Sequence, residues 1–195
     1  MMKNKIIDLF SGAGGLSLGF ENAGYDTVLA IDFWQPAIET FNYNRKNKVG
    51  LVKDITTLDE NFFKNYDLDN VCGIVGGPPC QGFSMAGRRI IDDERNKLCR
   101  DYFRVLKIIN PYFFVMENVT GILNLNGGAV KDDIFKRANE AGYKVFIKTL
   151  CAAEHGVPQN RRRVFFVGIR KDKVKGDFNF PVDLNYRVNC EEAIS

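Results

Sequence analysis

The stretch Lys5-Ile6-Ile7-Asp8-Leu9-Phe10-Ser11-Gly12-Ala13-Gly14-Gly15 lies near the start of the chain and decides its class of fold. The apolar run at 5–10 predicts a buried strand, and the amphipathic stretch at 16–23 predicts a helix. Glycines between a strand and a helix allow a tight turn and a close approach of the backbone to a ligand. The stretch therefore predicts a first β–turn–α unit with a ligand at its turn.

Strands and helices alternate along the rest of the chain. Short apolar runs predict further strands at 27–31, 71–75, 112–116, 144–150 and 164–169. Apolar residues at helical spacing predict further helices at 36–44, 95–109 and 132–141. This alternation favours an α/β protein with a mostly parallel, Rossmann-like sheet and helices on both faces.

The composition fits one globular domain. The 195 residues are 45% hydrophobic and 26% charged, which suffices for a sizeable core. No run approaches the roughly 18 uncharged apolar residues of a membrane span, so we expect a soluble intracellular protein. Five cysteines without a C-x-x-C pair, and a single histidine, argue against a structural zinc site or a disulfide framework. We therefore expect no metal, and one cysteine is a candidate nucleophile.

The charge is unevenly distributed, although the formal net charge is only +3. Residues 158–175 carry seven basic and one acidic side chain, and residues 86–107 carry seven and four. Two basic segments in a nearly neutral chain indicate a local contact with a polyanion, or else a solvated charged face.

The glycine-rich turn has features of a nucleotide-like cofactor site. The dinucleotide pattern G-x-G-x-x-G is not met, because Ser17 occupies the third glycine position, and no Gly-Lys-Ser/Thr follows to bind phosphates. Asp32 comes 20 residues after Gly12, at the end of the second predicted strand, where an acid can hold ribose hydroxyls. Adenosine without a phosphate chain fits better, as in S-adenosylmethionine. A plain β–α turn is the alternative.

Two further residues are candidates to contact an adenine ring. Phe33 is placed to cover its face, although an aromatic residue beside a strand end is more often part of the core. Asp54 follows a short apolar pair and is placed to accept a hydrogen bond from the adenine amino group, a surface-turn acid being the alternative.

A second loop, Gly76-Gly77-Pro78-Pro79-Cys80-Gln81-Gly82-Phe83-Ser84, follows the predicted strand 71–75. Its glycines and prolines predict a stiff turn that carries Cys80 to the sheet edge where α/β proteins bind ligands. A cysteine there is placed to act as a thiolate nucleophile, whereas an inert cysteine would lie within a strand, as Cys72 does.

Charged residues follow the same edge. Glu117 comes directly after the predicted strand 112–116 and is a general-acid candidate, a solvated acid being the alternative. Gln159-Asn160-Arg161-Arg162-Arg163 precedes the last strand, and alternation puts Gln159, Arg161 and Arg163 on one side. Three neighbouring arginines are equally suited to binding phosphates.

Taken in order, these motifs resemble the DNA cytosine-5 methyltransferase family over roughly residues 5–170. The resemblance is carried by Asp8–Gly15, Asp32, Asp54, Pro78–Gln81, Arg95-Asn96-x-Leu98, Glu117-Asn118-Val119 and Gln159-x-Arg161-x-Arg163. One departure is Asp32, where the family usually has Glu; the shorter acid should still reach a ribose hydroxyl.

The resemblance implies a cofactor, S-adenosylmethionine, with S-adenosylhomocysteine as product. The residues that would bind it are Phe10, Ser11, Gly12, Gly14, Gly15, Leu16, Asp32, Phe33, Asp54, Ile55, Pro78 and Leu98. It also implies that the Cys80 thiolate adds to carbon 6 of a cytosine flipped out of DNA. Glu117 would then hold ring nitrogen 3 and the amino group, Arg163 the carbonyl oxygen, and Arg161 and Gln159 would order the surrounding loop.

The resemblance further implies a catalytic domain over residues 1–195, with 176–195 leading into a target-recognition region that this sequence does not include. The chain is then either truncated or one subunit of a split enzyme; the expected partners are double-stranded DNA and, for a split enzyme, a complementary chain carrying that region and the final motifs. The expected setting is a bacterial restriction–modification system, in the cytoplasm and associated with the nucleoid through DNA, with no membrane contact. The alternatives are a transfer RNA cytosine-5 methyltransferase and an inactive cofactor-binding or partner-binding half of a split enzyme.

Overall fold

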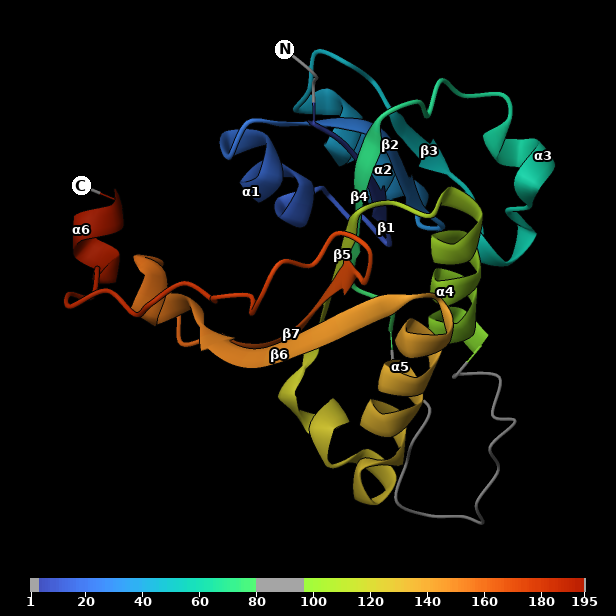
Figure 1. Cartoon of the computed structure of the whole chain (residues 1–195). Coiled ribbons are helices and arrows are strands. Elements are labelled where there is room, and N and C mark those ends of the chain that lie inside the picture. The colour runs from blue at the N-terminus through green and yellow to red at the C-terminus, as the bar shows by residue number, and fades with distance from the viewer. Residues whose placement is uncertain (1–3, 80–96, 195) are drawn as a thin grey trace.

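A seven-stranded sheet runs through the computed structural model, which describes residues 4–79 and 97–194 (Figure 1). The strand order is β3-β2-β1-β4-β5-β7-β6. The strands are β1 (Asn4–Leu9), β2 (Tyr25–Asp32), β3 (Gly50–Val52), β4 (Val71–Gly76), β5 (Phe113–Val119), β6 (Tyr143–Cys151) and β7 (Arg162–Arg170). Strands β1 to β5 run parallel, and β7 is antiparallel to both of its neighbours.

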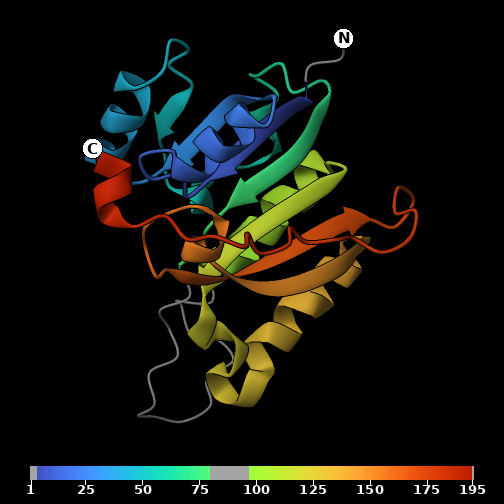
Figure 2. The same ribbon diagram turned by 90° about the vertical axis from the view of Figure 1, so that its left-hand side faces the viewer.

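Helices cover both faces of this sheet, as the sequence predicts. The α-helices are α1 (Gly15–Asn22), α2 (Gln35–Tyr43), α3 (Glu60–Phe63), α4 (Lys97–Ile109), α5 (Ala129–Glu140) and α6 (Cys190–Ile194). The short 3₁₀ turns include η1 (Ile55–Thr57), η3 (Thr120–Leu123), η4 (Leu125–Gly128) and η5 (Ala152–His155). Figure 2 shows α1 on the near face of the sheet, with α4 and α5 on the far face. Within the described ranges, none of these helices has the length and apolar character needed to cross a membrane.

The six strands predicted from apolar runs are all present. The structure differs from the prediction in two short elements and in the start of one helix. β3 has three residues and α3 has four, which is too short for periodicity to detect. α5 begins at Ala129, three residues before the predicted start. The predicted helix 95–109 is seen from Lys97 onward, and residues 95–96 lie outside the described part.

The core between the sheet and α4 explains why that helix forms where it does. Tyr102, Val105 and Leu106 occupy one face of α4 and are fully buried. The Tyr102 ring packs edge-on against Phe114 of β5, and its hydroxyl donates to the Ile74 carbonyl at 3.4 Å. A buried tyrosine whose hydroxyl has a partner fixes the helix against β4 and β5.

One edge of the sheet collects the ends of the central strands. Leu9 lies beside Gly76 in the register, and Gly76 lies beside Met116, so β1 and β4 end together and β5 continues three residues further, to Val119. Because β7 runs the other way, it enters the sheet at this edge, with Arg163 opposite Val119. The carboxyl edge of the sheet therefore gathers the loops that the sequence singles out.

Candidate active site

The glycine-rich loop after β1 has a left-handed backbone conformation that glycine adopts without strain. Gly12 and Gly14 have φ values of 53° and 87°, in the left-handed region that favours glycine. A Cβ on Gly14 would lie 2.5 Å from the Phe41 ring and 2.6 Å from the Arg45 guanidinium, so a side chain has no room there. A Cβ on Gly12 or Gly15 would meet nothing within 4 Å. The loop is thus packed on one side and leaves an open backbone surface on the other.

Asp32 joins this loop to the end of β2. Its Oδ2 accepts a hydrogen bond from the Gly12 N–H at 2.8 Å, and its Oδ1 accepts one from the Trp34 N–H at 2.9 Å. Phe33, the next residue, is 71% exposed, so the expectation that such an aromatic belongs to the core does not apply. An acid, an exposed aromatic ring and an open glycine surface together suit the ribose and adenine of S-adenosylmethionine.

The remaining cofactor candidates lie around the same edge with different degrees of burial. The Asp54 side chain accepts a hydrogen bond from the Thr56 N–H at 2.9 Å and caps η1, which is the surface-turn role. Ile55 and Pro78 are buried. Leu16 and Leu98 are half-buried, in the first turns of α1 and α4. Contact of these residues with adenine stays a prediction.

Glu117 lies near the carboxyl end of β5, and its side chain faces two arginines. Its Oε1 is 2.9 Å from Arg163 Nε and 3.6 Å from Arg161 Nη2. The side chains of Glu117 and Arg163 are only 25% and 24% exposed. Arg161 and Arg163 reach the same carboxylate, as the alternation along the strand predicts. The carboxylate is thereby held in a fixed direction at the carboxyl edge.

The loop after β4 lies beside Glu117 and is bonded to the next residue, Asn118. Asn118 Nδ2 donates to the Pro78 carbonyl at 2.8 Å, and both groups are buried. A Cβ on Gly77 would lie 3.3 Å from Glu117 Oε2, so the loop backbone runs directly alongside the acid. Cys80, two residues beyond Pro78, lies outside the described residues, as do Gln81, Arg88, Arg89 and Arg95. The described structure brings the entry of the cysteine loop to Glu117.

Gln159 is separate from this cluster. It is exposed, and its N–H donates to the Val157 carbonyl at 2.7 Å in the turn before β7. Among the described contacts, its side chain makes none with Glu117. Its predicted role in ordering the loop around Arg163 stays a prediction.

The basic residues of the segment 158–175 lie towards both ends of β7, and the expected contact with a polyanion stays a prediction. Arg161 and Arg163 lie at the carboxyl edge, whereas Arg170 lies at the other end of the nine-residue strand β7 and pairs with Asp172 at 2.7 Å. In the described part of the segment 86–107, Arg104 pairs with Asp101 and donates to the carbonyls of Leu58 and Ile55. Arg104 therefore has a structural role, because its guanidinium is bonded to groups of the chain itself.

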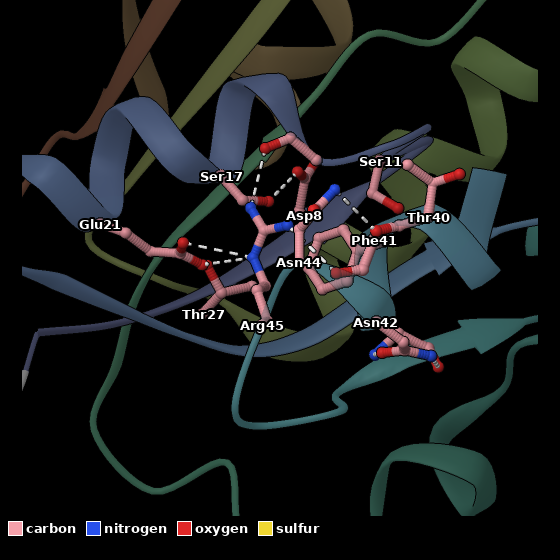
Figure 3. Close-up of polar contacts among 12 residues, drawn as sticks. Asp8, Ser11, Ser17, Glu21, Thr27, Thr40, Phe41, Asn42, Asn44 and Arg45 are labelled. Atoms are coloured by element: carbon pink, nitrogen blue, oxygen red, sulfur yellow. Dashed lines mark hydrogen bonds and ion pairs between the residues drawn. The ribbon is translucent and has the colours of Figure 1, made fainter.

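Two polar side chains next to the glycine loop, those of Ser17 and Arg45, were not indicated as functional by any sequence motif (Figure 3). Ser17 matters to the sequence argument as a missing glycine, yet its Oγ donates to Oδ2 of the fully buried Asp8. The other oxygen, Oδ1, is buried without a hydrogen-bond partner among the described residues. Burial raises the pKa of Asp8 to about 7. Arg45, which lies in no motif, donates to the Gly14 carbonyl at 2.8 Å.

Comparison with curated proteins gives close matches over nearly the whole chain. The Type II methyltransferase M.DdeI of Desulfomicrobium norvegicum is 48% identical over 173 residues, which make up 86% of this chain and 41% of that protein. M.FnuDI of Fusobacterium nucleatum is 46% identical over 182 residues, 93% of this chain and 51% of that protein. The chain spans about half the length of the curated relatives it matches.

Comparison with solved structures and with a family model also gives methyltransferases. A protein encoded within an Escherichia coli prophage, named as a DNA modification methyltransferase, superposes with a TM-score of 0.84 at 33% identity, covering 97% of this chain and 54% of that one. The Dnmt2 methyltransferase of S. pombe gives 0.73 at 26%, covering 90% and 53%. The family model for C-5 cytosine-specific DNA methylases matches residues 4–192. The Rossmann-like methyltransferase fold is confirmed, and the chain belongs to the C-5 cytosine-specific DNA methylase family.

Proposed function

We propose that this chain carries the catalytic part of an enzyme that transfers a methyl group from S-adenosylmethionine to carbon 5 of cytosine in DNA. The observation that supports this best is the cluster at the carboxyl edge. There Glu117, held by Arg163, lies against the loop that leads to Cys80. The names of the relatives, Type II methyltransferases, favour a bacterial restriction–modification setting, in the cytoplasm and on nucleoid DNA.

The cofactor site in this proposal is the open surface of the glycine loop. Asp32 would hold the ribose, Phe33 would cover the adenine, and the backbone of Gly12–Gly15 would approach the ligand closely. When bound, S-adenosylmethionine supplies an electrophilic methyl group on its sulfonium. The other residues proposed to line the site are Phe10, Ser11, Leu16, Asp54, Ile55, Pro78 and Leu98.

The chain's own residues would activate the base. The Cys80 thiolate forms a bond to carbon 6, and the displaced electron pair makes carbon 5 nucleophilic enough to take the methyl group. Glu117 holds ring nitrogen 3 and the amino group and shares a proton with the ring as charge builds there. Arg163 holds the carbonyl oxygen, while Arg161 and Gln159 order the loop around it. Carbon 5 then loses its proton, and the sulfur–carbon bond breaks to release the thiolate.

A stacked base is out of reach of these groups, so the proposal includes flipping of the cytosine out of the duplex. Unstacking costs a few kcal/mol, of the order that enzymes acting on bases supply from contacts with the flipped nucleotide and its neighbours. Double-stranded DNA is therefore the proposed partner. In this proposal residues 1–195 form the catalytic domain, and 176–195 lead towards a recognition region supplied by a complementary part.

Covalent trapping tests the nucleophile. DNA containing 5-fluorocytosine should give a stable adduct, because fluorine at carbon 5 cannot leave as a cation. The adduct should form with the unchanged chain and with Cys190→Ser, which removes an exposed cysteine, but not with Cys80→Ser. The assay is run on the chain alone and mixed with the carboxyl-terminal half of a longer relative. Trapping through Cys72, Cys99, Cys151 or Cys190 would refute the assignment, and trapping on RNA instead of DNA would favour the transfer RNA alternative.

A further inference from the structure

We propose that Arg45 is a positioning residue for the cofactor loop, acting through the carbonyl of Gly14. This inference rests on the proposed function, because it takes the loop Gly12–Gly15 to be the S-adenosylmethionine site. Arg45 lies just beyond the end of α2 and 31 residues from Gly14 in sequence. None of the motifs that mark the site contains it.

The guanidinium joins three parts of the structure (Figure 3). Its Nη2 donates to the Gly14 carbonyl at 2.8 Å, and its Nε lies 3.1 Å from Glu21 Oε1 on α1. The guanidinium carbon also lies 3.8 Å from the centre of the Phe41 ring on α2. Glu21 Oε1 accepts a further hydrogen bond from Thr27 Oγ1 of β2 at 2.7 Å. The guanidinium thus contacts the loop, α1 and α2, and Glu21 extends this group of contacts to β2.

Burial makes these contacts persistent. The Arg45 side chain is 11% exposed and that of Glu21 is 26% exposed, so solvent screens the pair less than it screens a surface ion pair. The guanidinium also fills the space beside Gly14 that a side chain there would need. Arg45 and the glycine are therefore matched to each other in shape as well as in hydrogen bonding.

Fixing the Gly14 carbonyl fixes the peptide that opens α1. This carbonyl accepts the first hydrogen bond of the helix, from the Leu18 N–H at 3.0 Å, and Arg45 takes its second acceptor direction. In a trans peptide the carbonyl and the following N–H point in opposite directions. Holding the Gly14 carbonyl against Arg45 therefore turns the Gly15 N–H away from the guanidinium, and Gly15 is a residue that borders open space. Arg45 would set the loop surface without touching the cofactor.

Cofactor affinity of the 195-residue chain tests this role. Arg45→Gln removes the charge, and Arg45→Lys keeps the charge but loses the planar fork. We expect Arg45→Gln to raise the dissociation constant of S-adenosylmethionine about 10- to 100-fold, the loss that one charge-assisted hydrogen bond represents. Arg45→Lys should fall between Arg45→Gln and the unchanged chain. Where methyl transfer is measured with the complementary half present, the KM for the cofactor should rise with kcat nearly unchanged.

Arg170→Gln is the matched control. Arg170 also pairs with a carboxylate, Asp172, donates to a backbone carbonyl, that of Asn110, and lies 5.4 Å from an aromatic ring, Tyr112. It lies at the opposite end of β7 from the site, so its loss should leave the dissociation constant unchanged. Hydrogen exchange should accelerate at the amides of residues 12–17 in Arg45→Gln and not in Arg170→Gln.

The outcomes separate the two proposals. If the unchanged chain binds S-adenosylmethionine and both Arg45 variants bind it equally well, the positioning role is wrong. If Arg170→Gln loses as much affinity as Arg45→Gln, the loss reflects general destabilisation, and the role is again refuted. If the unchanged chain shows no affinity for S-adenosylmethionine, the proposed function fails and the inference fails with it.

Discussion

Asp32 uses both of its carboxylate oxygens to hold backbone N–H groups, those of Gly12 and Trp34. Each oxygen has a second acceptor direction, which leaves capacity for ribose hydroxyls. Asp32→Ala should weaken S-adenosylmethionine binding by about 1.5–3 kcal/mol, the loss of a charge-assisted hydrogen bond. Asp32→Glu, which restores the family's usual acid, should recover most of it. Calorimetry measures both, and an unchanged affinity in Asp32→Ala would place the pocket elsewhere.

The glycines of the loop allow a cleaner test of where the ligand lies. Gly14→Val should weaken cofactor binding, but its side chain would also collide with Phe41 and Arg45. Gly15→Ala adds a methyl group into open space at the first position of α1, where alanine costs no backbone strain. We expect its thermal midpoint to equal or exceed that of the unchanged chain while its S-adenosylmethionine affinity falls. Equal affinity would show that the ligand does not approach Gly15.

Buried Asp8 gives the stability of the chain a dependence on pH. Its pKa is raised by burial from 3.8 to about 7, so the folded chain binds this proton more tightly than the unfolded chain. The associated stability is fully present below pH 4 and is lost as the pH rises through about 7. Asp8→Asn has no such proton. The free energy of unfolding of the unchanged chain, minus that of Asp8→Asn, should therefore fall between pH 5 and pH 8 in urea titrations. A difference that stays flat would contradict the buried, protonated state.

At the level of secondary-structure elements, the pairing of β5 with β7 brings Glu117 to Arg163. Gly168 lies opposite Phe114 in this ladder, and a Cβ on Gly168 would overlap the Phe114 ring. Gly168→Ala should therefore destabilise the chain by about 1–3 kcal/mol through overpacking. Gly19→Ala is the control, because its methyl group meets nothing within 4 Å and a helix-interior alanine should stabilise by roughly 0.5–1 kcal/mol. Chemical denaturation of both variants compares them directly.

How far elements can be predicted depends on their length and their neighbours. Apolar runs and helical spacing predict β1, β4 and α4 closely, because each has enough buried positions to show a period. Strand direction is different: the run 164–169 looks like any other buried strand, and its antiparallel placement between β5 and β6 follows from tertiary pairing. The sequence therefore predicts the class of fold better than the order within the sheet.

The same distinction holds for the site. Glu117 and the arginines could be placed together, because strand ends meet at a common edge and alternation along the chain is regular. Arg45 could not, since a contact across 31 residues leaves no local pattern. Asp8 belongs to a motif, yet its partner Ser17 is visible only once α1 is packed over β1.

For the molecule as a whole, the distribution of positive charge predicts how DNA binding responds to salt. The association constant should fall steeply with added salt as phosphate contacts release counterions. Arg162 is exposed at the carboxyl edge, so Arg162→Gln should reduce the slope of log affinity against log salt by about one. Arg170→Gln should leave it unchanged, because Arg170 lies at the far end of β7. Equal slopes for all three proteins would exclude the carboxyl edge as the contact.

The chain alone should methylate DNA weakly and with little sequence preference, in keeping with its span of about half the length of its relatives. Adding the carboxyl-terminal half of a longer family member should raise the rate and restore preference. Incorporation of labelled methyl groups into DNA of defined sequence measures both. Full, sequence-specific methylation by the chain alone would show that no complementary part is needed.

The placement of β7 also affects how the protein is made. During synthesis, β5 is complete at Val119, whereas β7 begins at Arg162 and is complete only at Arg170, 51 residues later. Until then β5 has an open backbone edge, the kind of surface through which nascent chains associate with one another. Over the same interval Glu117 would lack its ion pairs with Arg161 and Arg163. Translation that stalls between residues 119 and 162 would therefore leave an aggregation-prone intermediate whose sheet is ordered only on its amino-terminal side.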